Sequence, residues 1–171
     1  CGLTLPGWYW QHTGYFEPYL KEITDMMTPA YGQSELVKKL CAEFQTTDTC
    51  AVHVRGGDII GPGRPFFGRA LARMEKERPG LRYLVFTNDR EAAKEALEGE
   101  HTERKMTYIS ELGAFSDIDE FFLMAACRHQ IISNSSYSTW AAYLNPNPEK
   151  VVIMPEYKGC EQIRLKEWIV L

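Results

Sequence analysis

The chemistry of this chain converges on the stretch Thr49-Cys50-Ala51-Val52-His53-Val54-Arg55-Gly56-Gly57-Asp58, which joins a predicted buried strand to a polar end. Apolar and β-branched residues run through its first part, which predicts a strand inside the protein. His53 and Arg55 are two positions apart, so a strand places both side chains on one face. The pair Gly56-Gly57 then permits a tight turn and a close approach of the backbone to a ligand.

Arg55 has the clearest ligand chemistry in this stretch. In open α/β sheets, ligands bind at the carboxyl ends of the strands. A guanidinium group at that place suits a diphosphate, because it pairs with phosphate oxygens through two parallel hydrogen bonds. The alternative interpretation is structural: Arg55 makes an internal salt bridge, and His53 is a core histidine whose hydrogen bonds are satisfied.

Strands and helices alternate on both sides of this stretch. The spacing of apolar residues predicts two helices within residues 18–44, separated near Pro29 and Gly32, with Ser34 as an N-cap. Further strands are predicted over residues 83–86, 106–109, 130–133 and 151–154, the last of the chain. Helices are predicted over residues 66–78, 90–98 and 116–127, and around 140–144. Such alternation predicts an α/β fold with a parallel sheet flanked by helices.

The composition of this 171-residue chain is that of a globular domain and limits its partners. A net charge of −4 disfavours nonspecific binding to nucleic acid or to anionic membranes, so any anion site must be local. No apolar run approaches the roughly 18 residues that a membrane span needs. Cys50 and Cys127 lie in apolar runs and are expected to be buried thiols, which favours a reducing compartment.

Two other predicted strands also end in polar residues. Thr87-Asn88-Asp89 follows one of them, and Asn134-Ser135-Ser136 leads from another into a helix. Backbone N–H groups and hydroxyls at a helix N-terminus suit phosphate, so this helix and Arg55 could together balance a diphosphate without a metal. Plain N-capping by serine is the structural alternative. The chain has neither a P-loop nor the glycine pattern of dinucleotide-binding proteins.

Two further patterns favour other functions. Asp117 and Asp119 form a DxD pair that could hold a divalent ion on a diphosphate, as in a metal-dependent transferase. Acidic residues are also favoured at a helix N-terminus without any metal. An aromatic cluster could instead stack on a sugar in a noncatalytic nucleotide- or glycan-binding module, or could pack a linker against the core. Its members are Trp8, Tyr9, Trp10, Tyr15 and Phe16.

Four motifs, taken in order, resemble the α-1,2-fucosyltransferases of glycosyltransferase family 11, and more distantly the α-1,6- and protein O-fucosyltransferases. Residues 7–11, GWYWQ, with Tyr15-Phe16 resemble the segment before that family's donor domain. Residues 53–58, HVRGGD, resemble its HVRRGD signature, and residues 86–89, FTND, are similar to its FSDD. The longest likeness runs from Asp119 to Leu144 and includes IISNSS and WAAYL.

The resemblance implies the donor-binding half of a GT-B glycosyltransferase, a Rossmann-like parallel sheet with flanking helices. It implies inverting transfer of L-fucose from GDP-fucose to the 2-hydroxyl of a galactose-terminated oligosaccharide, with neither a metal nor a cofactor. Arg55 would be the catalytic residue, binding the β-phosphate and neutralising the departing GDP. His53 and Asp119 would contact the guanine. The other positions implied in the GDP-fucose site are Gly57, Asn134, Ser135 and Ser136.

The chain departs from the family pattern in two respects. Gly56 stands where the family has its second arginine, which removes one positive charge from the signature. Family members also begin with an N-terminal Rossmann-like half, so residues 1–45 are expected to be a lead-in segment with helices joining that half. Residues 46–171 are expected to be the GDP-sugar-binding domain of an incomplete enzyme. The expected location is the cytoplasm for a bacterial protein and the Golgi lumen for a eukaryotic one.

Overall fold

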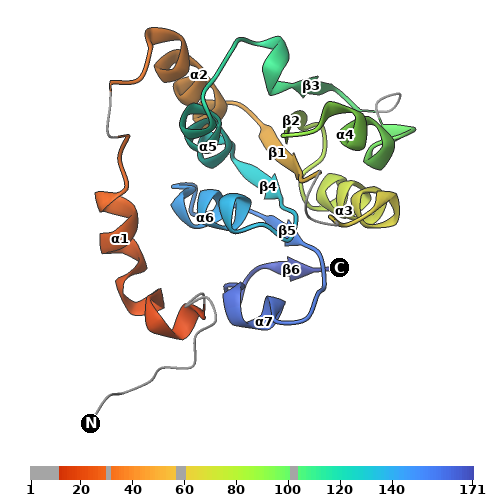
Figure 1. Ribbon diagram of the computed structural model, residues 1–171. Helices are drawn as coiled ribbons and strands as arrows, with labels where there is room; N and C mark the ends of the chain where they lie inside the picture. Colours follow the sequence, from red (N-terminus) through yellow and green to blue (C-terminus); the bar gives the residue numbers. More distant parts are fainter. Residues whose placement is uncertain (1–11, 30–31, 57–60, 101–103) are drawn as a thin grey trace.

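The predicted parallel sheet is present in the computed structural model, which describes residues 12–29, 32–56, 61–100 and 104–171 (Figure 1). Six strands pair in the order β3-β2-β1-β4-β5-β6, and every pair is parallel. Their bounds are β1 Thr49–Val54, β2 Arg82–Thr87, β3 Met106–Tyr108, β4 His129–Ile131, β5 Val152–Met154 and β6 Ile169–Val170. The structure therefore confirms the α/β fold.

Helices precede the sheet and connect its strands, and α2 begins at the predicted cap. The Ser34 hydroxyl accepts a hydrogen bond from Val37 N at 3.3 Å at the start of the second α-helix. The 3-10 helices are η1 Thr13–Tyr15, η2 Glu17–Tyr19 and η4 Ile109–Glu111. The α-helices are α1 Leu20–Met26, α2 Glu35–Thr46, α3 Arg64–Glu77, α4 Arg90–Ala96, α5 Asp117–Ala126, α6 Ser136–Leu144 and α7 Cys160–Ile163.

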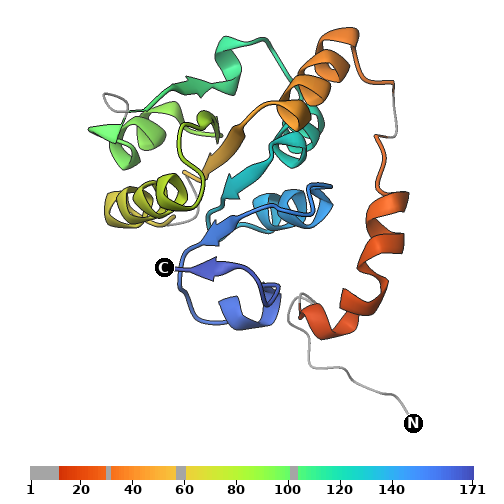
Figure 2. The ribbon, with the colours of Figure 1, turned by 180° about the vertical axis from the view of Figure 1, so that it is seen from behind.

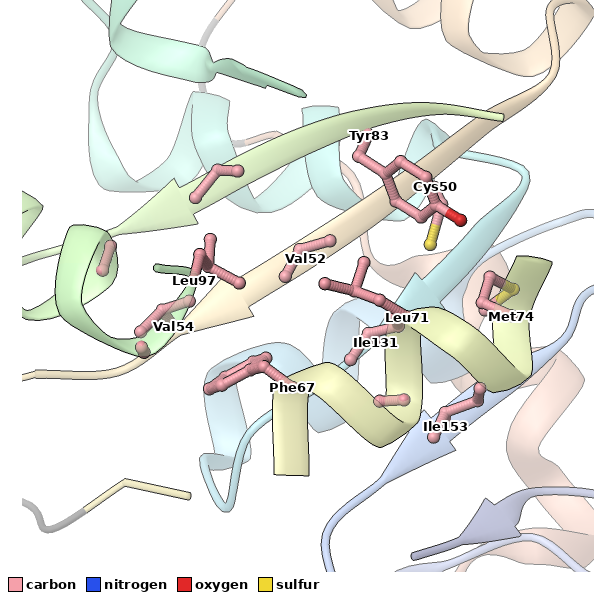
Figure 3. Close-up of a cluster of buried hydrophobic side chains, with 14 of the residues drawn as sticks. Cys50, Val52, Val54, Phe67, Leu71, Met74, Tyr83, Leu97, Ile131 and Ile153 are labelled. Atoms are coloured by element: carbon pink, nitrogen blue, oxygen red, sulfur yellow. The ribbon is translucent and has the colours of Figure 1, made fainter. Parts of the chain in front are cut away.

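Alternation along β1 assigns its side chains to two cores. Cys50, Val52 and Val54 lie in one core with residues of α3 and α4 (Figure 3). Ala51 lies in a second core with residues of α2, α5 and α6, on the opposite face of the sheet. Because side chains of a strand alternate between faces, the α5 and α6 face also receives His53, the next residue of that parity.

The strand order changes direction beside β1. The chain passes from β1 outward through β2 and β3, and then returns to place β4, β5 and β6 on the other side. In doubly wound sheets, the carboxyl ends of the two strands at such a reversal border the ligand crevice. The stretch that ends in Arg55 and the stretch that follows β4 therefore meet at the edge of the sheet where a ligand is expected.

The lead-in helices differ in how they join the sheet. Val37, Leu40 and Phe44 of α2 belong to the core with α5, so α2 packs directly beneath the sheet. Helix α1 contacts α6 and lies outside the sheet layers, as both views of the ribbon show (Figures 1 and 2). The proposed division between residues 45 and 46 remains a prediction, and the packing of α2 adds that helix to the body around the sheet.

Two smaller expectations have clear outcomes. Cys50 and Cys127 are fully buried free thiols, as predicted. The prediction that the strand at β5 is the last was wrong, because β6 follows it at the sheet edge. A pairing of two residues is too short to show an alternating pattern in the sequence. Among the described residues, no helix combines the length and the apolar character needed to cross a bilayer.

Candidate functional site

A cavity of about 210 Å³ opens beside the carboxyl end of β1. It receives residues from β1, from β2 and the loop after it, and from the first turns of α5 and α6. Its lining residues are His53, Arg55, Phe86, Thr87, Asn88, Asp117, Glu120 and Tyr137. The structure thus brings His53 and Arg55 to one hollow, as their spacing along a strand predicts.

His53 is a buried, neutral ring held by a hydrogen bond to the loop after β4. Its Nδ1 lies 2.8 Å from the hydroxyl of Ser133, the residue two positions after β4. Burial, and then the nearby Arg55 guanidinium, lower the pKa of His53 from its ordinary 6.5 to about 3. The ring therefore carries no charge at neutral pH, and its hydrogen bond with Ser133 fixes the orientation of the ring beside the cavity.

Acidic and aromatic groups of α5 and α6 face the same cavity as Arg55. Asp117 and Glu120 are three residues apart on α5, so they lie on one face of that helix. Burial, and then the neighbouring Asp117, raise the pKa of Glu120. The Tyr137 hydroxyl donates to the backbone oxygen of Asp117, and the Tyr137 ring centre lies 5.8 Å from that of His53. The cavity therefore has a cationic residue and an acidic pair in its wall.

Asp119, the predicted guanine contact, has its carboxylate in a helix cap. Its Oδ2 accepts from the Ser116 hydroxyl at 2.7 Å and from Ser116 N at 3.3 Å, while Asp119 N donates to the Ser116 hydroxyl. This capping box starts α5. Asp119 is not among the residues that line the cavity, whereas Asp117 and Glu120 on either side are. Its predicted contact with guanine remains a prediction.

The same geometry bears on the metal alternative. Asp117 lines the cavity while the Asp119 carboxylate is bonded to Ser116, so the two acids of the DxD pair are engaged in different surroundings. Within the described ranges, no group of three or more His, Cys, Asp or Glu residues is arranged to hold a metal ion.

The loop after β4 contacts the site through the hydrogen bond between Ser133 and His53, and the three residues predicted there do not line the cavity. Ser135 is the N-cap of α6 but makes no side-chain capping hydrogen bond. Asn134, Ser135 and Ser136 do not line the cavity, although Tyr137 in the first turn of α6 does. Their predicted contacts with phosphate stay predictions. Ser133 belongs to the same polar strand end in the sequence, over residues 133–136, but no role at the site was predicted for it.

The glycines after Arg55 can be followed only in part. Gly57, predicted in the donor site, and Asp58 lie outside the described residues. Gly56 is buried, and its N–H and C=O both bond to the side-chain amide of Asn88. An added Cβ at Gly56 would lie 2.6 Å from Asp89 Cβ and 3.0 Å from Ala92 Cβ, at the start of α4. The absence of the family's second arginine therefore matches a backbone packed tightly against α4.

Gly56→Arg, which restores the family residue, is expected to lower the free energy of unfolding by about 1–3 kcal/mol. The cause is the clash of the new Cβ with Asp89, which caps α4 through hydrogen bonds to Glu91 N and Ala92 N. Urea unfolding measures the change. Gly56→Ala adds the same Cβ without a charge and should account for most of the loss; an arginine variant as stable as the original chain would contradict this packing.

The aromatic cluster near the beginning is also divided. The Phe16 ring stacks on Trp140 with ring centres 5.3 Å apart and meets Tyr143 edge-on at 5.5 Å. Phe16 therefore packs the lead-in against α6, whereas Tyr15 is exposed. Trp8, Tyr9 and Trp10 lie outside the described residues.

The reversal of strand order and the polar crevice beside it define a Rossmann-like α/β domain of the kind that glycosyltransferases use. The chain belongs to glycosyl transferase family 11, whose family model matches residues 3–171. This confirms the resemblance inferred from the four motifs.

Two curated relatives, both from Escherichia coli, are similar to this chain. The O-antigen biosynthesis glycosyltransferase WbnK is 28% identical over 151 residues, which cover 77% of this chain and 48% of WbnK. An alpha-1,2-colitosyltransferase is 26% identical over 157 residues, which cover 86% of this chain and 53% of that enzyme. The chain thus spans about half the length of the curated relatives it matches.

Proposed function

We propose that this chain holds the donor GDP-fucose and, within a complete enzyme, serves the inverting transfer of L-fucose to the 2-hydroxyl of a galactose-terminated oligosaccharide. The observation that carries the proposal is the distribution of charge in the wall of the crevice, which contains the cationic Arg55 together with the acidic Asp117 and Glu120. GDP has the complementary pattern, since its diphosphate is anionic while one edge of guanine presents N–H donors.

The acidic pair accounts for recognition of the base. A carboxylate of Glu120 can accept from guanine N1–H and from its 2-amino group, a pattern that adenine and uracil do not present. The neutral His53 adds a ring nitrogen, and Tyr137 offers an aromatic surface against which a base can stack. In this proposal Glu120 reads the guanine and Asp119 caps the helix that carries Glu120.

Arg55 accounts for the diphosphate. The 210 Å³ cavity is smaller than the roughly 300–1,000 Å³ of a complete ligand pocket, so it suits the guanosine part of the donor. A second hollow of about 510 Å³ shares Arg55 and is lined also by Gly56, Gly61, Arg64 and residues of α4. Arg55 thus stands between two hollows, where the phosphates of a donor would link its base to its sugar.

The proposed reaction needs a residue that meets charge on the leaving group. The bond between the fucose anomeric carbon and the β-phosphate oxygen breaks, and negative charge grows on GDP as the acceptor oxygen attacks the opposite face of the sugar. Arg55 would stabilise this charge with the N–H donors of its guanidinium group. The acceptor proton passes to a general base.

The proposal is tested by titrating the chain with GDP, ADP, UDP and a free galactose-terminated oligosaccharide, with and without EDTA. Selective binding of GDP that EDTA leaves unchanged is the expected result. Loss of GDP binding in EDTA would support the metal-dependent alternative. Binding of the oligosaccharide without binding of GDP would overturn the proposal in favour of a noncatalytic glycan-binding module.

Glu120→Gln is expected to lower the affinity for GDP about tenfold, because an amide cannot accept both guanine hydrogens. Inosine diphosphate lacks the 2-amino group, so the preference for GDP over inosine diphosphate should shrink in this variant. Calorimetric titration of both ligands measures the ratio. Asp119→Asn is the matched control and should lower thermal stability while keeping the ratio; a ratio that shrinks in Asp119→Asn instead would assign guanine to Asp119.

A second candidate donor is a colitosyl nucleotide, because one relative is named an alpha-1,2-colitosyltransferase. Colitose lacks the 3-hydroxyl of fucose, and a site built to bond a hydroxyl rejects an analogue without it. Competition between the two donors against bound GDP would separate them. Both relatives come from a bacterium, which supports the bacterial alternative and, with it, a place in the cytoplasm.

A further inference from the structure

The side chain of Asn88 makes two hydrogen bonds to one residue, Gly56. Gly56 N donates to Asn88 Oδ1 at 3.0 Å, and Asn88 Nδ2 donates to the Gly56 carbonyl oxygen at 3.1 Å. The two residues are 32 positions apart, one following β1 and the other following β2. Because both ends of the amide are used at once, the backbone after β1 is held in one position relative to β2.

These two hydrogen bonds act directly on the backbone of Arg55. The N–H of Gly56 belongs to the peptide unit whose carbonyl is that of Arg55, so fixing the N–H direction also fixes the backbone torsion that aims the arginine. Asp89 and Ala92 close off the space around Gly56, since a Cβ added there would lie within 3.0 Å of both. The backbone next to Arg55 is therefore held by hydrogen bonds to Asn88 and by packing against Asp89 and Ala92.

Both partners are positions where short motifs of this chain depart from the family patterns, as Thr87 also is. Gly56 replaces the second arginine of HVRRGD, and Asn88 replaces the first aspartate of FSDD. An aspartate at position 88 could accept from Gly56 N, but it has no N–H to donate to the Gly56 carbonyl oxygen. Gly56 and Asn88 therefore contact each other through two hydrogen bonds, of which an aspartate at position 88 could form only one.

We propose that Asn88 is a positioning residue that aims the Arg55 guanidinium at the donor's diphosphate through its bonds to Gly56. This inference rests on the proposed function of Arg55 and adds a residue that acts through it. Asn88 lines the same cavity as Arg55, so a direct contact with the ligand is the competing explanation of any effect. Dependence on Arg55 separates the two, because a positioning role has no effect once the arginine is absent.

The experiment is a double-mutant cycle read with two ligands, GDP and guanosine. Asn88→Ala is expected to weaken GDP binding about tenfold, the effect of about 1.4 kcal/mol in binding, and to leave guanosine binding unchanged. In the Arg55→Ala background, Asn88→Ala should cause no further loss of GDP affinity. Asn88→Ser removes the two amide bonds to Gly56 without adding a charge, so it reports the same cycle if the alanine variant does not fold.

A matched control comes from another asparagine that bonds the backbone at both ends of its side chain. Asn147 Nδ2 donates to the Arg128 carbonyl oxygen, and its Oδ1 accepts from Glu149 N, away from the cavity. Asn147→Ala should lower stability without changing the ratio of GDP to guanosine affinity.

The outcomes separate the two levels of inference. Unchanged GDP affinity in Arg55→Ala would overturn the proposed function itself. A normal loss in Arg55→Ala, together with an Asn88→Ala effect that persists in full without the arginine or that is equal for guanosine, would overturn the positioning role alone.

Discussion

Replacement of Arg55 by alanine is expected to weaken GDP binding about 100-fold, or about 2.7 kcal/mol, while guanosine binding stays within about twofold. Arg55 is the cationic residue in the wall of the 210 Å³ cavity and also borders the larger hollow beside it. A planar guanidinium can make two parallel hydrogen bonds to phosphate oxygens in a crevice where water screens charge poorly. The alanine variant loses both hydrogen bonds and the charge. Guanosine has no phosphate, so its binding does not depend on them.

Arg55→Lys refines the expectation, because lysine retains the charge but not the planar pair of donors. Its GDP affinity should lie between those of the alanine variant and the original chain. Calorimetric titration with GDP and guanosine supplies the measurement. Arg73→Ala is a suitable control, since Arg73 is an exposed arginine on α3 that pairs with Glu77 outside the cavity. Equal losses for GDP and guanosine in Arg55→Ala would show that the arginine supports the fold and not the phosphates.

The sequence was sufficient for the fold because its signals are local and repeated. Apolar strands alternate with amphipathic helices, and serine at positions 34 and 116 marks helix starts that the structure confirms. The alternation in β1 was enough to place His53 and Arg55 on one side of the sheet. The two-residue strand β6 escaped prediction, since its pairing depends on a partner strand rather than on its own pattern.

The cavity could be predicted only in part, because side-chain direction at a helix start depends on three-dimensional contacts. Successive helical residues point about 100° apart, so Asp117 and Glu120 line the cavity while Asp119, which lies between them in sequence, does not. The bond to Ser116 is what draws the Asp119 carboxylate into the cap. The sequence contains the pattern of a capping box in Ser116 and the acid three residues later. This pattern assigns Asp119 to the helix cap and leaves Glu120 to face the cavity.

Contacts between residues far apart in the sequence could not be predicted either. Ser133 reaches His53 across 80 positions, and Asn88 reaches Gly56 across 32. Neither pairing follows from periodicity or composition, because each requires the strand order of the sheet. They became visible only once β1 was placed between β2 and β4.

Acidification from pH 7 to pH 5 is expected to lower the free energy of unfolding by about 4 kcal/mol, about 2 kcal/mol for each of two buried histidines. Burial is the main reason that the pKa is lowered to about 3 for His53 and about 4 for His129; Arg55 adds to it at His53, and Arg78 and Arg128 at His129. In the unfolded chain these rings take up protons near pH 6.5, while in the folded protein they stay neutral. Stability is therefore complete above pH 6.5 and declines as the pH falls toward 4.

His129→Asn isolates one of the two contributions. His129 Nδ1 accepts from Val151 N at 3.1 Å, and an asparagine oxygen can occupy a similar position without titrating. The variant should lose about half of the pH dependence, or about 2 kcal/mol between pH 7 and pH 5, in urea unfolding at both values. Leu71→Val serves as the control, because a smaller core residue lowers stability equally at the two pH values. If the free energy of unfolding falls as much between pH 7 and pH 5 in His129→Asn as in the original chain, proton uptake on unfolding occurs at other residues. If the fall is reduced to half, His129 at the amino end of β4 is one source of the acid sensitivity, and His53 beside Arg55 is the other.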